Sequence, residues 1–106
     1  LFMSSDNQQL GLPKTLEECF TYLDQSLDEE TKNEIRKLSE VEVIINLHFT
    51  LGMKIRNEWG LWGESELKQY FENKGVMHPD DMSTSILTSY IKYLNGKSKD
   101  LNDIMK

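Results

Sequence analysis

The sequence predicts an all-α fold, because apolar residues recur at helical spacing along most of the chain and helix-start signals precede them. Capping boxes, in which a hydroxyl residue is followed three positions later by glutamate, begin at Thr15 and at Ser39. The alternation of apolar and polar residues that is typical of a half-buried strand is sustained nowhere. We therefore expect residues 12–106 to form one compact domain of about five helices, preceded by a flexible lead over residues 1–11.

The first predicted helix spans residues 15–27 and begins at the first capping box. A short second helix follows over residues 28–38, with Asp28 as its N-cap. The apolar residues that we expect to face inward are Leu16, Cys19, Phe20, Leu23 and Leu27 in the first helix, and Ile35 and Leu38 in the second.

The third predicted helix is the longest and runs from Ser39 to Trp59 without a break. Its predicted apolar face consists of Val41, Ile44, Ile45, His48, Leu51, Ile55 and Trp59. It ends in the segment Trp59-Gly60-Leu61-Trp62-Gly63, because two glycines there interrupt the helical pattern. Gly52 lies one turn before Arg56, and we expect its missing side chain to let another helix approach.

Two further helices are predicted over residues 65–73 and 79–94, and a last short turn over residues 98–105. The segment His78-Pro79-Asp80-Asp81 is typical of a helix start, with proline at the first helical position and acids near the positive end of the dipole. Across all five helices, the residues that we expect to be buried in the core are Phe20, Leu23, Ile44, Leu51, Ile55, Trp59, Leu67, Phe71, Ile86 and Tyr90.

The charge of the chain is acidic and unevenly placed. Eighteen acids against twelve bases give a net charge of −6, and nine of the acids lie between Glu17 and Glu42. A protein that binds nucleic-acid phosphates carries the opposite charge, so we expect no nucleic-acid partner. No apolar run approaches the length of a membrane helix, so we expect no membrane span.

The single cysteine, Cys19, excludes a disulfide within the chain and falls among the apolar positions of the first predicted helix. We interpret it as a small core residue of a protein from a reducing compartment. The expected location is therefore the cytoplasm, and the alternative is the periplasm or export after removal of a signal peptide.

The sequence contains no recognised catalytic motif. It has neither a nucleophile elbow nor a glycine-rich phosphate loop, so we expect no catalytic residues and no cofactor. The histidines, His48 and His78, each lack a second histidine three or four positions away, so we expect no metal site.

One cluster of polar and aromatic residues goes beyond what a helical bundle requires. Its members are His48, Arg56, Trp59, Trp62, His78, Asp80 and Asp81. In the structural interpretation, both indoles fill the core and Arg56 pairs with Asp80 or Asp81, joining the third predicted helix to the fifth. In the functional interpretation, tryptophan and arginine mark a binding hot spot, or the cluster forms a small ligand-binding or enzymatic site.

Several segments taken together resemble a known family. They are Leu47-His48-Phe49, Ile55-Arg56-Asn57, Trp59-Gly60-Leu61-Trp62-Gly63 and His78-Pro79-Asp80-Asp81-Met82-Ser83. With these segments the chain is similar, from Leu12 to Asn95, to an uncharacterised family of small bacterial proteins that is classed as a domain of unknown function. The resemblance implies a free-standing bacterial domain of the kind found near contact-dependent toxins, and it brings no catalytic role.

Our leading hypothesis is a non-enzymatic protein-binding domain, specifically an immunity protein or inhibitor that neutralises a basic toxin or effector. Complementary charge raises the rate of such an association. The expected partner-binding face is acidic and consists of Glu17, Asp24, Glu29, Glu30 and Glu34. The alternatives are the ligand-binding or enzymatic domain built on the polar and aromatic cluster, and a helical module that self-associates.

Overall fold

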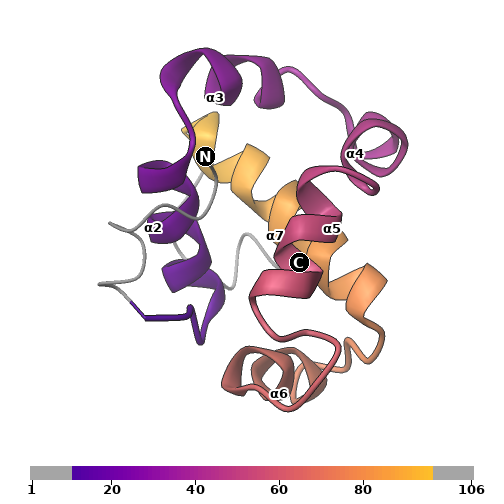
Figure 1. Cartoon of the computed structure of the whole chain (residues 1–106). Helices are drawn as coiled ribbons and strands as arrows, with labels where there is room; N and C mark the ends of the chain where they lie inside the picture. Colours follow the sequence, from indigo (N-terminus) through magenta and orange to yellow (C-terminus); the bar gives the residue numbers. More distant parts are fainter. Residues whose placement is uncertain (1–10, 97–106) are drawn as a thin grey trace.

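The structure of the chain, a computed structural model, describes residues 11–96 and is all-α (Figure 1). Within this range there are six helices and no strand: α2 (Leu16–Ser26), α3 (Glu29–Ile35), α4 (Glu40–Leu47), α5 (Leu51–Glu58), α6 (Glu66–Glu72) and α7 (Pro79–Leu94). The predicted fold class is confirmed. The expected flexible lead, apart from Gly11, and the expected turn over residues 98–105 lie outside the described residues.

Five of the six described helices, all except α5, begin where the sequence predicts, because polar side chains accept hydrogen bonds from the free N–H groups of their first turns. The side chains of Thr15, Asp28, Ser39, Ser65 and His78 act in this way at the starts of α2, α3, α4, α6 and α7. The box at Ser39 is complete, since Glu42 also accepts a hydrogen bond from the Ser39 backbone N–H.

Helix α7 is the centre of the fold and packs against α2, α4, α5 and α6 (Figure 1). Its buried residues include Met82, Ile86, Leu87 and Tyr90, which join one hydrophobic core with residues of α2, α5 and α6. Cys19 lies in this core, as predicted, and burial raises the pKa of its thiol.

The predicted third helix is wrong, because residues 39–59 form two helices instead of one. Helix α4 ends at Leu47, and α5 begins at Leu51 after a turn over residues 48–50. At this turn the Thr50 hydroxyl lies 3.2 Å from the Asn46 carbonyl oxygen and 3.4 Å from that of Leu47, and it donates to both. The hydroxyl therefore satisfies carbonyl groups that a continuous helix would have bonded to backbone N–H groups.

The break turns α4 away from the predicted face. Val43 is buried and Leu47 packs against the core, whereas Ile44 is 54% exposed and was wrongly expected in the core. Val41 and Ile45 are exposed as well. Ile44 was placed in the core because the predicted apolar face assumed one uninterrupted helix through residue 59. The turn over residues 48–50 interrupts that helix, so the apolar positions of α4 and α5 do not share one face.

The rest of the predicted core is confirmed, except that Leu51 is half-buried and packs at its edge. The buried members are Phe20, Leu23, Ile55, Trp59, Leu67, Phe71, Ile86 and Tyr90. The apolar periodicity thus predicts the buried residues correctly everywhere except in α4 and at Leu51.

A polar contact fastens α2 to α7. The Tyr90 hydroxyl donates to Asp24 Oδ1 at 2.7 Å, and the Tyr93 hydroxyl donates to Asp24 Oδ2 at 2.9 Å. Phe20 stacks on the Tyr93 ring with a centroid distance of 4.9 Å. Each carboxylate oxygen of Asp24 is therefore used within the fold, which makes this residue an anchor between helices.

The two isoleucines Ile55 and Ile44 give a matched test of the observed faces. Ile55 is 0% exposed, so Ile55→Ala is expected to lower the free energy of unfolding by about 2–5 kcal/mol. Ile44→Ala on the exposed face is expected to change it by no more than about 0.5 kcal/mol. Urea unfolding measures both values, and equal losses would contradict the turned face of α4.

All four tyrosines favour the neutral form in the folded state, which predicts a loss of stability in alkali. Burial raises the pKa of Tyr22 and Tyr70, and burial together with the hydrogen bond to Asp24 raises the pKa of Tyr90 and Tyr93. Because the unfolded chain ionises near pH 10, stability is complete below that pH and falls as the pH rises above it.

Phenolate absorbance as a function of pH checks this prediction. In the folded protein ionisation is expected above pH ~10, and in urea it is expected at the ordinary value of about 10. Tyr90→Phe should make the alkaline loss of stability shallower. A native tyrosine that ionises as readily as an unfolded one, and that disappears in Tyr90→Phe, would contradict the contact with Asp24.

Candidate functional site: a buried arginine cluster and an apolar groove

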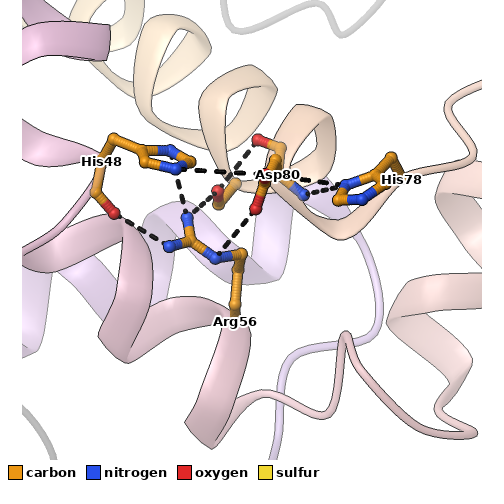
Figure 2. Close-up of polar contacts among 5 residues, drawn as sticks. His48, Arg56, His78 and Asp80 are labelled. Atoms are coloured by element: carbon orange, nitrogen blue, oxygen red, sulfur yellow. Dashed lines mark hydrogen bonds and ion pairs between the residues drawn. The ribbon is translucent and has the colours of Figure 1, made fainter.

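Arg56 is a charged residue in the interior, with only 5% of its side chain exposed. It lies in the last turn of α5, on the side that faces the start of α7, and its guanidinium is surrounded by groups from the turn after α4 and from α7 (Figure 2). A guanidinium carries five N–H donors and no acceptor, so its burial requires several oxygen or nitrogen acceptors nearby.

Those acceptors come from the turn after α4 and from α7. Arg56 Nη2 donates to the His48 carbonyl oxygen at 2.9 Å, and Nη1 donates to Ser83 Oγ at 2.9 Å. Nε lies 3.4 Å from Asp80 Oδ1 and forms an ion pair with it. Arg56 thus binds the turn over residues 48–50 to the first turns of α7.

The His48 ring lies between Arg56 and Asp80. Nδ1 of His48 lies 3.5 Å from Arg56 Nη1. Nε2 of the same ring lies 4.0 Å from Asp80 Oδ2. Asp80 consequently faces both the guanidinium and the imidazole (Figure 2).

His78 has a separate, local role on the other side of Asp80 (Figure 2). Its Nδ1 accepts a hydrogen bond from the Asp80 backbone N–H at 3.0 Å, which caps the start of α7. On the surface of the protein, the Trp62 ring lies edge-on to the His78 ring with a centroid distance of 6.0 Å. The contact leaves both side chains exposed.

The structure brings together only part of the predicted polar and aromatic cluster. The pairing of Arg56 with Asp80 is confirmed, while Asp81 is exposed and is not the partner of Arg56. Trp59 is buried, as predicted, and packs edge-on against the Tyr22 ring at 5.6 Å. Trp62 was wrongly expected in the core, because it follows the positive-φ Gly60 in a turn that directs it outward.

Gly52 admits both the Arg56 guanidinium and the end of α4. A Cβ atom at this position would lie 3.0 Å from the Leu47 carbonyl oxygen and 3.1 Å from Arg56 Nη1. The missing side chain therefore lets the guanidinium and the end of α4 lie close to the first turn of α5.

The acidic residues that we expected to form one face are divided by the fold. Glu29, Glu30 and Glu34 are exposed together on α3. Glu17 lies in the first turn of α2, about 14 Å along the helix from its C-terminal end. Asp24 faces the two tyrosines of α7.

A concavity lies between the α2–α3 corner and the α4–α5 pair. It has a volume of about 960 Å³, and its apolar floor is formed by Leu27, Ile35, Leu38, Leu47 and Leu51. Phe49 and Met53 line it while 74% and 41% exposed. Asp28, Glu34, Lys54 and Glu58 add polar groups to its lining. We call this concavity the α3–α5 groove.

Phe49 and Met53 were not predicted as site residues, although the sequence contains a signal for them. They follow Ile45, a member of the predicted apolar face, at intervals of four residues. A helix that packs against the core on one side buries only one apolar stripe, and this segment carries two. The second stripe indicates residues left exposed for another contact.

A family model for a domain of unknown function (DUF6794) matches residues 12–94. The chain belongs to this family. No curated protein and no solved structure is similar enough to match. The family match covers all six described helices. It therefore includes the α3–α5 groove and the arginine cluster, by which we mean Arg56 with His48, Asp80 and Ser83.

None of the helices described is long and apolar enough to cross a bilayer. Within residues 11–96, no three side chains of histidine, cysteine, aspartate or glutamate are grouped so that they could hold a metal ion.

Removal of the buried guanidinium is expected to destabilise the fold strongly. Arg56→Ala removes the hydrogen bonds to Ser83 and to the His48 carbonyl and the ion pair with Asp80, so the free energy of unfolding should fall by about 3 kcal/mol or more. Arg56→Lys should restore little of it, because one ammonium group cannot reach all three acceptors in a fork geometry.

Urea unfolding again provides the measurement, and Lys54→Ala is the matched control. Lys54 is an exposed base in the same helix, and its removal should change stability by no more than about 0.5 kcal/mol. If Arg56→Ala unfolds like the unmodified protein, the cluster does not hold the fold together and a binding role for Arg56 gains support.

Proposed function

We propose that this protein is a non-enzymatic protein-binding domain whose docking site is the α3–α5 groove. The observation that carries the proposal is the apolar side chains of Phe49 and Met53, exposed beside an apolar floor. A large exposed aromatic residue at the edge of a concavity is typical of a surface that another protein covers.

The occupied donors and the burial of Arg56 favour this proposal over an enzymatic function. A catalytic arginine must offer donors to a substrate, but the donors of Arg56 are directed to Ser83, to the His48 carbonyl and to Asp80. Its side chain is also almost entirely covered by protein. The geometry of the cluster is therefore better suited to fixing the turn over residues 48–50 than to binding a small molecule.

The charge of the chain supports a basic partner. The net charge is −6, and Glu29, Glu30 and Glu34 project from α3, which forms one wall of the groove. A field of this sign accelerates the approach of a positively charged protein. The specific form that we propose is an inhibitor that neutralises a basic toxin or effector.

Affinity capture from the organism that encodes the chain tests the binding function. The unmodified protein and the variants Phe49→Ser and Met53→Gln serve as baits, with Met77→Gln as the matched control. Met77 is an exposed methionine outside the groove. We expect one partner to be retained by the unmodified protein and by the control, and to be lost from both groove variants.

Two outcomes would contradict the proposal. A partner retained equally by all four baits would place binding elsewhere on the surface. Turnover of a small substrate by the purified protein, abolished by a change in the arginine cluster, would replace the binding function with an enzymatic one.

A further inference from the structure

We infer that the α3–α5 groove receives an amphipathic α-helix of the partner, with apolar residues on one face and lysine or arginine residues beside them. The inference rests on the proposed binding function and deepens it, because it names the kind of element that fills the groove. Three observations carry it: the walls of the groove, the arrangement of its apolar groups and the charges at its sides.

The walls favour an occupant that satisfies its own backbone. The groove is lined by residues of α2, α3, α4 and α5 and of the connections between them, and the described residues include no strand edge. An extended peptide placed here would find no backbone ladder for its N–H and C=O groups. A helix carries these bonds internally and presents only side chains.

The apolar groups are arranged on two sides of the groove. Ile35 and Leu38 come from the α3 side, and Phe49 and Met53 come from the turn after α4 and from α5. The floor between them is apolar as well. Residues at positions i, i+3, i+4 and i+7 of a helix form one such apolar stripe, and grooves between helices commonly bind it.

The charges select a basic helix. Glu34 stands on the α3 wall and Glu58 on the α5 wall, so acids line both sides of the apolar floor. Neither forms an ion pair with a residue of the described part of the chain. Lys54 is the one base among the lining residues, against Asp28, Glu34 and Glu58. A helix with basic residues beside its apolar stripe complements this pattern.

Three fluorescently labelled synthetic peptides test the inference by anisotropy. The first has leucines at i, i+3, i+4 and i+7 spacing with lysines elsewhere; the second replaces the lysines by glutamates; and the third rearranges the first into strict alternation. We expect the first peptide to bind the intact protein at least about tenfold more tightly than either of the others, and more weakly as salt is added.

Matched variants locate the site. Met53→Gln and the double variant Glu34→Lys with Glu58→Lys are each expected to weaken binding of the first peptide by at least about tenfold. Met77→Gln and Glu64→Lys, which change an exposed methionine and an exposed glutamate outside the groove, should leave it unchanged. Circular dichroism of each variant checks that the helical fold is intact.

Three results would overturn the inference: no binding of the first peptide, equal binding of all three peptides, or equal binding by the groove and control variants. A fourth is a dimer of this chain, seen by analytical ultracentrifugation and dissociated by Met53→Gln, which would make a second copy the occupant. If the peptides fail while capture of a partner still depends on Phe49 and Met53, the binding function stands and only the helical, basic occupant is wrong.

Discussion

A buried positive charge has to be supplied with acceptors wherever it lies, and the fold is organised around that requirement at Arg56. The guanidinium donates hydrogen bonds to the His48 carbonyl and to the Ser83 hydroxyl, and it forms an ion pair with the Asp80 carboxylate. Withdrawal of any ion from water costs several kcal/mol, so these contacts offset a penalty as much as they add stability. The contacts add polar links between α5, the turn after α4 and α7, which the hydrophobic core also joins.

The consequence of this joint is the position of the turn over residues 48–50. Its His48 carbonyl is held by Arg56, and the His48 ring in turn packs edge-on against the Phe49 ring at 4.7 Å. Phe49 is therefore supported from behind while its outer surface lines the α3–α5 groove. A binding surface placed on a turn needs such support, because an unsupported aromatic side chain would pay conformational entropy on binding.

The local signals in the sequence predicted most of the fold, and the long-range contacts explain what they missed. Capping residues and apolar periodicity located the helix starts and nearly all of the core, since both act over a few residues. The break after Leu47 was not predictable in this way, because residues 47–51 contain no glycine or proline. The Thr50 hydroxyl and the Arg56 guanidinium donate to backbone carbonyls at the break, and these contacts are visible only in the folded structure. The Arg56–Asp80 pair was predictable because a buried arginine needs a carboxylate partner. The α3–α5 groove was not predictable, because it depends on how helices far apart in the chain pack.

The account makes Arg56 and Asp80 an energetically coupled pair between α5 and α7, and a double-mutant cycle measures that coupling most directly. Urea unfolding of Arg56→Gln, Asp80→Asn and the double variant should give a coupling free energy of about 1 kcal/mol or more. The cycle with Lys54→Gln and Asp81→Asn, two exposed residues of the same helices, should be additive. Additivity within about 0.3–0.5 kcal/mol for Arg56 and Asp80 would contradict the claim that the ion pair of the buried Arg56 with the half-exposed Asp80 holds the two helices together.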